Sequence, residues 1–488
     1  MWFEDLIERI DRLVWGPLLL GMLMGTGVYL SILLKFLSVR RLKTALKYAL
    51  GLEEKRETKR GKNCKVAEKE QHSRGRVSSF SSLTTELAAT IGTGNIIGVS
   101  TAMVLGGPGA LFWMVITSIF GMATKLVESS LAVRFRVTNK KGQTVGGPMY
   151  VMEQVFPIRC LRHVMAWWFA FLAVCASFGM GNMVQANSIA ESLFVTFHVP
   201  KAESGLILSF LVVLIVLGGI SVIGKVTQYL VPFMGILYLS GIAAVLILYW
   251  KNIPLAIGGI ISAAFCPSAV SGGIFGQITI SAFDSMRWGI SRGIFSNEAG
   301  LGAAGITAAA ANTEDPVRQG YISMTGVFLD TVVICTATGL ALAASGVFGM
   351  VDGNGRALSG AALTMVMFQS VFGEFGGCFM AICIVLFAFA TIIGWAYQGE
   401  RAFEFLMRGN TKHNIKYRFI YGLIAFPGCV FPLELVWNIS DICNGLMAFP
   451  NLICVLSLSG MACEMIVKHE KNRIGNNRIG NRIGKQKK

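Results

Sequence analysis

The chain has 488 residues, of which 53% are hydrophobic and 14% charged, with a mean hydropathy of +0.60 and a formal net charge of +16. A soluble domain keeps roughly a quarter of its residues charged, so this composition excludes a soluble fold and requires lipid around most of the chain. The Lys and Arg residues lie between apolar segments, which favours basic loops facing anionic lipid over nucleic-acid binding.

The cysteines and the short glycine motifs do not indicate catalysis. The eleven cysteines occur singly, mostly within apolar segments, so we expect neither a disulfide framework nor a metal site. The strings Gly92-x-Gly94 and Gly106-Gly107-x-Gly109 follow no predicted strand, which argues against a dinucleotide site. We therefore expect no enzyme activity and no cofactor beyond a coupling ion.

In chain order, the apolar segments predict six regions. Residues 1–13 are amphipathic and predict a short interfacial helix, and residues 14–36 predict a first spanning helix. Residues 37–82 predict a basic cytoplasmic loop. The tail 467–488, which repeats Asn-Arg-Ile-Gly three times, predicts a basic, disordered cytoplasmic segment. Residues 83–250 and 251–466 each predict five more spans, which gives a total of about eleven. The eleven predicted spans are 14–36, 83–104, 110–133, 164–197, 205–221, 228–250, 255–280, 321–346, 377–403, 416–434 and 441–466.

Basic charge differs between alternate loops. One set carries 37 Lys and Arg residues and the opposite set carries five. Because cytoplasmic loops are enriched in Lys and Arg, this asymmetry predicts a multi-pass protein of the plasma (inner) membrane, with its N-terminus outside and its C-terminus cytoplasmic. Residues 360–374 are too short to span and predict a helix folded over the outer face. The basic set comprises 35–76, 134–162, 222–227, 281–320, 401–418 and the tail after 466.

Two predicted spans contain helix-poor residues near their centres. Span 83–104 is interrupted by Gly92-Thr93-Gly94-Asn95, and span 255–280 by a Pro and the Gly-rich run 271–276. Freed backbone groups have no water partner in mid-membrane, so a break is expected only where it has a role; the alternative for the first is a glycine face for close packing. With 14–36 set aside, each broken span comes first in its group of five. This order predicts inverted repeats with a binding site at the breaks.

Two such breaks suit an amino acid. An interrupted helix exposes amide N–H groups at the start of its second half, which attract a carboxylate. It exposes carbonyl groups at the end of its first half, which attract an ammonium group or Na⁺. We therefore expect an all-α integral membrane transporter for a small zwitterion.

Long motifs run through the chain from about residue 80 to 450. They are AATIGTGNIIGVSTA at 88–102, GGPGALFWM at 106–114, GMATKLVESSLAVRFR at 121–136, GGPMYVME at 146–153, FGMGNMVQANS at 178–188, RGIFSNEAGLG at 292–302, DPVRQG at 315–320 and ATIIGWAYQGERAFE at 390–404. The chain resembles the alanine or glycine:cation symporters, the sodium:alanine symporter family, from which it departs at Val115, Ala303 and Thr307. The resemblance implies a leucine-transporter-like fold, a five-plus-five inverted repeat with one extra N-terminal helix and two broken helices. It also implies Na⁺-coupled uptake of alanine or glycine, or of glutamine in some relatives.

The resemblance also implies which residues form the site. Thr93 and Asn95 would line the substrate at the first break. Gln185 would contact it, although an amide within a membrane can equally bridge helices. Thr391 and Trp395 share one helix face and would close the pocket, with Trp395 limiting side-chain size. The second break would offer the backbone of Gly272, Gly273, Phe275 and Gly276. The Na⁺ ligands would lie around Ala88, Ile91, Ala388 and Thr391.

Polar and charged residues in or near the spans are further candidates. Asp330 lies in mid-span, where it is either an ion or proton ligand or a hydrogen-bonded tie between helices. Asn297 and Glu298 fall in a segment expected to be a cytoplasmic helix and loop, where they would pair with Arg287 or Arg292 and latch the inner gate. We expect gate or surface pairs for Glu86, Lys125, Glu128 and Glu400.

Three functions fit these features. The first is sodium-coupled symport of a small neutral amino acid, alanine or glycine, by alternating access. The second is a proton-coupled transporter of an amino acid, or of glutamine, on the same scaffold, which would use Asp330 or a gate carboxylate. The third is a non-transporting channel or sensor. The expected partners are the small amino acid and membrane lipid, without nucleic acid, and we expect a monomer.

Overall fold

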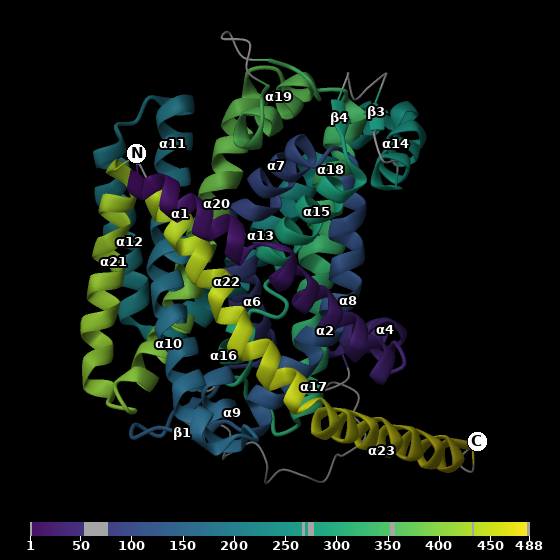
Figure 1. Ribbon diagram of the computed structural model, residues 1–488, viewed down its shortest axis with the longest axis vertical. Helices are drawn as coiled ribbons and strands as arrows, with labels where there is room; N and C mark the ends of the chain where they lie inside the picture. The colour runs from purple at the N-terminus through teal and green to yellow at the C-terminus, as the bar shows by residue number, and fades with distance from the viewer. Residues whose placement is uncertain are drawn as a thin grey trace.

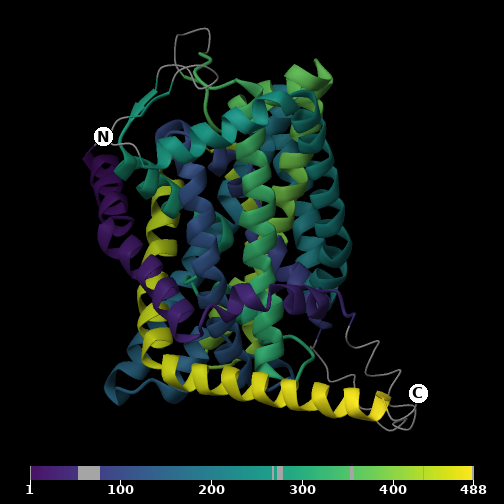
Figure 2. The ribbon, with the colours of Figure 1, turned by 90° about the vertical axis from the view of Figure 1, so that its right-hand side faces the viewer.

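The computed structural model is a bundle of long helices whose two termini lie at opposite ends of its long axis (Figure 1 and Figure 2). It describes residues 2–52, 77–265, 269–271, 278–351, 357–431 and 434–485. Seven helices in the described part of the chain are long and apolar enough to cross a membrane, so this is a multi-pass membrane protein. The total of about eleven spans also counts shorter and interrupted helices, and it stays a prediction.

Two consecutive helices open the chain, and two short ones follow. They are α1 (Trp2–Val14), α2 (Pro17–Leu33), α3 (Leu37–Arg40) and α4 (Leu42–Ala49). The apolar segment of membrane-crossing length runs from Asp5 to Leu33 and so includes most of α1. At the bend between the two helices, Trp15 Nε1 donates to the carbonyl of Asp441 at 3.0 Å. The boundary expected after residue 13 is therefore a bend within one helical segment that packs against α22.

The next part of the chain starts with a helix that is broken in its middle. The elements are α6 (Ser79–Thr90), the 3-10 turn η1 (Thr93–Asn95), α7 (Ile97–Leu105), α8 (Gly109–Arg134), β1 (Val137–Thr138), β2 (Thr144–Val145), α9 (Pro148–Val155), η2 (Arg159–Leu161), α10 (Arg162–Phe178), η3 (Gly179–Met183), α11 (Val184–Phe197), α12 (Lys201–Leu217) and α13 (Gly219–Leu248). Strands β1 and β2 pair antiparallel, Val137 with Val145. The π-helical turn η3 joins α10 and α11 into one long helix.

The rest of the chain contains a second interruption, between α15 and α16. The elements are η4 (Trp250–Asn252), α14 (Ile253–Phe265), β3 (Ala269–Ser271), β4 (Ile278–Ile280), α15 (Ala282–Asn297), α16 (Ala303–Ala308), α17 (Pro316–Val327), η6 (Phe328–Cys335), α18 (Thr336–Ser345), α19 (Gly360–Phe372), α20 (Phe375–Leu406), η7 (Thr411–His413), α21 (Asn414–Val430), α22 (Glu434–Ser457) and α23 (Ser459–Lys485). The π-helical turn η6 joins α17 and α18.

The range 255–280 is not a broken spanning helix, so that prediction is wrong. Helix α14 ends at Phe265, and β3 pairs antiparallel with β4, Ala269 with Ile280. Figure 1 shows this hairpin at the same end of the molecule as α19. The predicted site residues Gly272, Gly273, Phe275 and Gly276 lie outside the described residues.

The second interruption spans residues 298–302 instead. Glu298, Gly300 and Gly302 have φ values of 54°, 93° and 90°, a region of backbone conformation that glycine adopts without steric cost. The sequence interpretation missed this break because Arg287 and Arg292 counted as basic loop residues. The Arg292 guanidinium instead lies 5.7 Å from the ring of Trp288, and its Nη1 is 3.9 Å from Asp441 Oδ2. A basic residue on α15 is thus paired within the protein and does not mark a loop.

The short helix predicted at residues 360–374 is confirmed, its place on the outer face stays a prediction, and the disordered tail is not confirmed. The short apolar helix α19 covers most of residues 360–374, as expected. The tail is helical as far as Lys485, and α23 runs across the end of the bundle (Figure 2). Two contacts of Glu470 anchor this helix: Tyr321 Oη donates to Glu470 Oε1 at 2.9 Å, and Arg41 Nη2 lies 2.8 Å from Glu470 Oε2.

Candidate functional site

The first broken helix is α6 and α7, separated by three non-helical residues and the 3-10 turn Thr93–Asn95. In an unbroken helix the N–H of Gly92 would donate to the carbonyl of Ala88. It donates instead to Asn95 Oδ1 at 3.0 Å. The turn thereby frees the Ala88 carbonyl from its helical donor and is held by its own Asn side chain. The interruption predicted at residues 92–95 is confirmed.

Helix α20 packs directly against this break. A Cβ at Gly92 would collide with Thr391 Oγ1, and a Cβ at Gly394 would lie 2.6 Å from the backbone N of Ala89. Both glycines therefore permit an approach that any larger residue would block. The Thr391 hydroxyl stands beside the end of α6.

The residues predicted to bind Na⁺ belong to these two packed helices. Ala88 lies on α6 and Ile91 directly follows it, whereas Ala388 and Thr391 lie on α20, and all four are buried. The freed carbonyl of Ala88 and the Thr391 hydroxyl are oxygen donors of the kind that Na⁺ prefers. Their role as ligands stays a prediction.

Thr93 and Gln185, both predicted to contact substrate, are brought together. Thr93 Oγ1 donates to Gln185 Oε1 at 3.0 Å, and Gln185 Nε2 donates to the carbonyl of Met180 at 3.2 Å within the π-helical turn η3. Both side chains are buried, with 2% and 3% of their surface exposed. A pair of neutral polar groups thus lies sealed from solvent beside the first break.

Asp330 ties the two breaks together. Asn95 Nδ2 donates to Asp330 Oδ1 at 2.7 Å, and Ser296 Oγ, at the end of α15, donates to Asp330 Oδ2 at 2.8 Å. A third donor, Thr331 Oγ1, lies 2.8 Å from Oδ2. A Cβ on Gly94 would lie 3.6 Å from Cδ1 of Phe295, so the two interrupted helices meet here. Of the two roles expected for Asp330, the geometry favours the hydrogen-bonded tie.

Trp395 lies over the second break. Its Nε1 donates to Glu298 Oε1 at 3.1 Å. A Cβ on Gly181 would lie 2.5 Å from Cβ of Trp395, so the glycine leaves room for the indole. Trp395 is fully buried. The indole therefore connects α20, the π-helical turn η3 and the second break.

Asn297 and Glu298 do not form a cytoplasmic latch with Arg287 or Arg292, so that prediction is wrong. Both residues are buried in the bundle, where the Asn297 carbonyl accepts from Lys125 Nζ at 3.0 Å. The expectation failed because the segment was assigned to a loop, whereas it ends a helix inside the protein.

A buried charge network around Lys125 was missed as part of the site. Lys125 Nζ lies 3.6 Å from Glu86 Oε1, and each side chain is 1% exposed. On the same helix, Glu128 Oε1 accepts from Asn451 Nδ2, which also donates to the carbonyl of Gly300 at 2.9 Å. The sequence signal was present, because an ionisable residue within a span is costly unless it has a partner or a function.

Glu400 is also buried, but it lies in a separate ion-pair network. Its Oε2 is 2.7 Å from Nε of Arg418, and Arg401 is a second cationic partner. Arg401 Nη1 in turn lies 2.7 Å from Glu404 Oε2. The predicted pairing of Glu400 is thus confirmed, at a place where α20 meets α21.

The arrangement can bind a small zwitterion. The start of α7 presents backbone N–H groups that suit a carboxylate, and the end of α6 presents carbonyl groups that suit an ammonium group or Na⁺. Thr93, Gln185 and Thr391 add neutral oxygen and nitrogen atoms. Burial of all three excludes water, which strengthens each polar contact.

The fold is that of a known class of transporter. A solved structure, MhsT in complex with L-phenylalanine, superposes with a TM-score of 0.54 at 14% sequence identity, covering 81% of this chain and 98% of that one. MhsT has the leucine-transporter fold. The class defined by the fold and the first break is therefore that of leucine-transporter-like helical bundles with interrupted helices.

The chain belongs to the sodium:alanine symporter family, whose model matches residues 1–480. The sodium/alanine symporter AgcS of Methanococcus maripaludis is 43% identical over 464 residues, which cover 94% of this chain and 96% of AgcS. The probable sodium/glutamine symporter GlnT of Bacillus subtilis is 35% identical, over 93% of this chain and 88% of GlnT. The putative sodium/proton-dependent alanine carrier YrbD of the same organism is 31% identical, over 96% and 93%.

Proposed function

We propose that the chain is a secondary active transporter that couples Na⁺ to the uptake of a small neutral amino acid, with alanine or glycine as its substrates. One observation carries this proposal: Thr93, Gln185 and Thr391 surround a broken helix in the buried centre of a sodium:alanine symporter family member. The names of the relatives reported above include alanine or glutamine, which supports an amino acid as substrate.

Each substrate group would have its own partner. The carboxylate would accept hydrogen bonds from the N–H groups at the start of α7 and from the Thr93 hydroxyl. The ammonium group would donate to carbonyls at the end of α6 and to Gln185 Oε1, which now accepts from Thr93 at 3.0 Å. Trp395 would limit the size of the substrate side chain. At the second break, the backbone of residues 298–302 would contact the substrate, in place of the predicted run 272–276.

Sodium would bind at the contact of α6 with α20. The Ala88 carbonyl has lost its helical donor, and the Thr391 hydroxyl adjoins Gly92. Carbonyl groups near Ile91 and Ala388 would complete a set of hard oxygen ligands. A bound cation there would hold the end of α6 against α20, and so would favour the closed arrangement of the first break.

The proposed topology has eleven spans. The bend-containing segment α1–α2 is the extra helix, and two inverted groups of five follow, each starting with an interrupted helix, α6–α7 and α15–α16. The N-terminus would lie outside and α23 on the cytoplasmic face of the inner membrane, because the sequence concentrates Lys and Arg in one set of alternate loops and in the tail. Alternating access would move the two groups relative to each other in a monomer.

Uptake of labelled alanine into proteoliposomes tests this function. We expect saturable accumulation against the alanine gradient when Na⁺ is higher outside, and no accumulation with K⁺ in its place at the same pH. A panel of glycine, serine and glutamine at fixed Na⁺ ranks the substrates. Absence of Na⁺ stimulation contradicts the proposal, and equilibration without accumulation points to a channel.

Proton coupling is the second candidate, and a specific observation favours it. Glu86, Glu128 and Glu298 lie buried near one buried cation, Lys125. Both carboxyl oxygen atoms of Glu86, and one each of Glu128 and Glu298, have no hydrogen-bond partner among the described residues. Such surplus carboxyl groups are found along proton pathways in transporters. An inward proton gradient imposed without Na⁺ separates the candidates, because accumulation under that condition alone supports proton coupling.

A further inference from the structure

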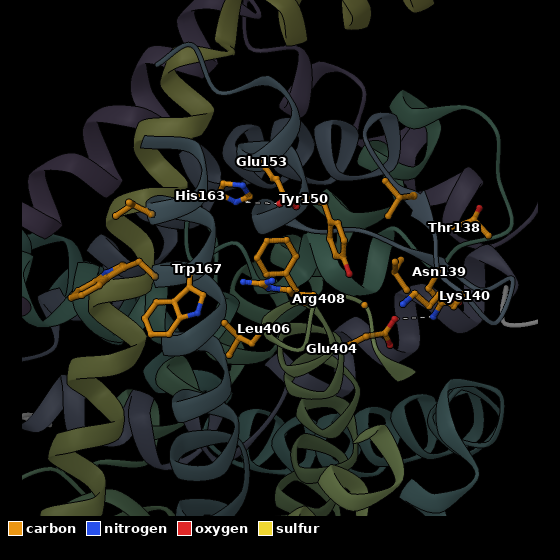
Figure 3. Close-up of a pocket in the computed structure, with 16 residues that line it drawn as sticks. Thr138, Asn139, Lys140, Tyr150, Glu153, His163, Trp167, Glu404, Leu406 and Arg408 are labelled. Carbon is orange, nitrogen blue, oxygen red and sulfur yellow. Dashed lines mark hydrogen bonds and ion pairs between the residues drawn. The ribbon is translucent and has the colours of Figure 1, made fainter. Parts of the chain in front are cut away.

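A cleft of about 1200 Å³ opens at the end of the molecule that carries α9 and α23, far along the chain from either break. It lies between the β1–β2 hairpin, α9, the start of α10 and the end of α20. Figure 3 shows its lining residues, with Arg408 in the middle of the group, between Trp167 and Tyr150. No residue of the proposed substrate site lines it, so it calls for a separate explanation.

One wall of the cleft is apolar and exposed. Trp167, Trp168 and Val164 on α10 have 53%, 45% and 60% of their surface exposed. The ring of Trp167 stacks on that of Phe171 at 5.3 Å, with 3° between the planes. Tryptophan is enriched where a membrane protein meets the interface between hydrocarbon and water. An exposed aromatic wall of this kind suits contact with lipid acyl chains near the membrane surface.

The cleft also carries positive charge without an ion-pair partner. Of its two carboxylates, Glu404 is paired with Arg401 at 2.7 Å, whereas Glu153 lies 3.3 Å from His163, which is charged only when protonated. In the described residues, neither Lys140 nor Arg408 has an ion pair or a side-chain hydrogen bond. Glu404 thus already has a permanently charged partner, and two exposed cations remain beside an aromatic wall.

We propose that this cleft binds one anionic phospholipid from the leaflet on the side of the basic loops. The lipid phosphate lies between Lys140 and Arg408, and an acyl chain runs along Trp167 and Trp168. Charge selects an anionic headgroup, because the cleft offers two cations without an ion-pair partner among the described residues, against the single Glu153 carboxylate that lacks a permanently charged partner. The exposed aromatic wall selects a lipid over a soluble phosphate, since a small anion leaves that wall uncovered.

Native mass spectrometry of the purified protein with added phosphatidylglycerol or phosphatidylcholine tests the site. We expect the wild type to retain phosphatidylglycerol more tightly. The double variant Lys140→Gln/Arg408→Gln should weaken phosphatidylglycerol binding about 25-fold, roughly five-fold for each basic residue near an anionic headgroup. It should leave phosphatidylcholine unchanged, whereas Trp167→Ala should weaken both lipids.

Lys251→Gln is the matched control. Lys251 is also an exposed lysine beside a tryptophan, with Nζ 6.0 Å from the Trp250 ring, but it lies outside the cleft. An equal loss in this control overturns the proposal, as does unchanged phosphatidylglycerol binding in the double variant. Displacement of the lipid by millimolar glycerol phosphate would show a small-anion site instead. Elution volume and thermal unfolding of each variant confirm that it is folded, and lipid retention is read without reference to transport.

Discussion

The two breaks that meet at Asp330 are held by different chemistry. The first is closed by neutral groups: Asn95 caps Gly92, and Thr93 bonds Gln185. The second is surrounded by charge, since Lys125 holds the Asn297 carbonyl and Glu298 accepts from Trp395. One centre therefore contains a neutral half at the first break and a charged half at the second break.

This difference indicates how the two breaks divide the work. A neutral hydrogen bond contributes only about 0.5–1.5 kcal/mol net, so a substrate that offers equivalent bonds can replace it at small cost. Breaking a buried charge pair costs about 3–5 kcal/mol. We infer that the first break exchanges partners with the substrate, while the second keeps its partners as a fixed frame.

The charged half is tested most severely by Lys125→Met. This variant leaves the Glu86 carboxylate and the Asn297 carbonyl without their buried cation, so we expect a loss of about 3–5 kcal/mol in stability and no uptake. Thermal unfolding in detergent and alanine uptake measure the two effects. Lys251→Met, at an exposed lysine, is the control. Stability within 1 kcal/mol of wild type would mean that the second break is not held by charge.

The close packing at the neutral half is tested by Gly92→Ala. The added methyl group would collide with Thr391 Oγ1, and overpacking of this kind costs about 1–3 kcal/mol. We expect uptake to fall at least tenfold, and Thr391→Ala in the same chain to restore part of the stability. Gly98→Ala is the matched control, because a Cβ there meets no atom within 4 Å. Normal uptake by Gly92→Ala would separate Thr391 from the site.

The partner exchange itself is tested by Gln185→Ala. Loss of the amide removes the acceptor for Thr93 and the expected contact with the substrate ammonium, so the KM for alanine should rise about tenfold, equivalent to about 1.4 kcal/mol. Gln398→Ala is the control, since Gln398 is a buried amide that donates to Thr307 Oγ1 at 3.3 Å. Equal KM values for wild type and Gln185→Ala would remove Gln185 from the pocket.

The smallest expected effect comes from a substitution at Trp395, whose indole donates to Glu298 at the second break. Trp395→Phe keeps an aromatic ring but loses the hydrogen bond to Glu298, at a cost of about 1 kcal/mol. We expect a modest fall in alanine uptake and a rise in the ratio of glutamine to alanine uptake, because the smaller ring leaves more room. A ratio unchanged from wild type would place the limit on substrate size elsewhere.

The sequence predicted the neutral half at the first break better than the charged half at the second break, for a physical reason. Gly92-Thr93-Gly94-Asn95 is helix-poor within an otherwise apolar run, so its break is visible locally. The break at 298–302 follows a helix that carries Arg287 and Arg292, which hid it among basic loops. The Gly-rich run near 272 gave a similar local pattern, but the described residues on either side of it pair as the strands β3 and β4 and do not form a helix. Lys125 could not be paired from sequence, because its partners come from distant helices.

The overall class was easier to predict than these contacts. Hydropathy and the motifs were enough for a multi-pass helical membrane protein of this family. They did not predict that the tail is helical, because its anchor, Glu470, depends on Tyr321 and Arg41, which are far apart in the chain. Long-range partners of this kind are not encoded in any single window of sequence.

The π-helical turns η3 and η6 give this centre a property that an α-helix lacks. Each turn accommodates one residue beyond the α-helical repeat, next to Gln185 in one case and around Asp330 in the other. Deleting that residue would let the helix wind as a regular α-helix and would close the wider turn beside Gln185 or around Asp330. The local backbone at Gln185 and Asp330 is therefore set by an inserted residue, so a one-residue deletion there would disturb the centre without changing any side chain that forms its hydrogen bonds.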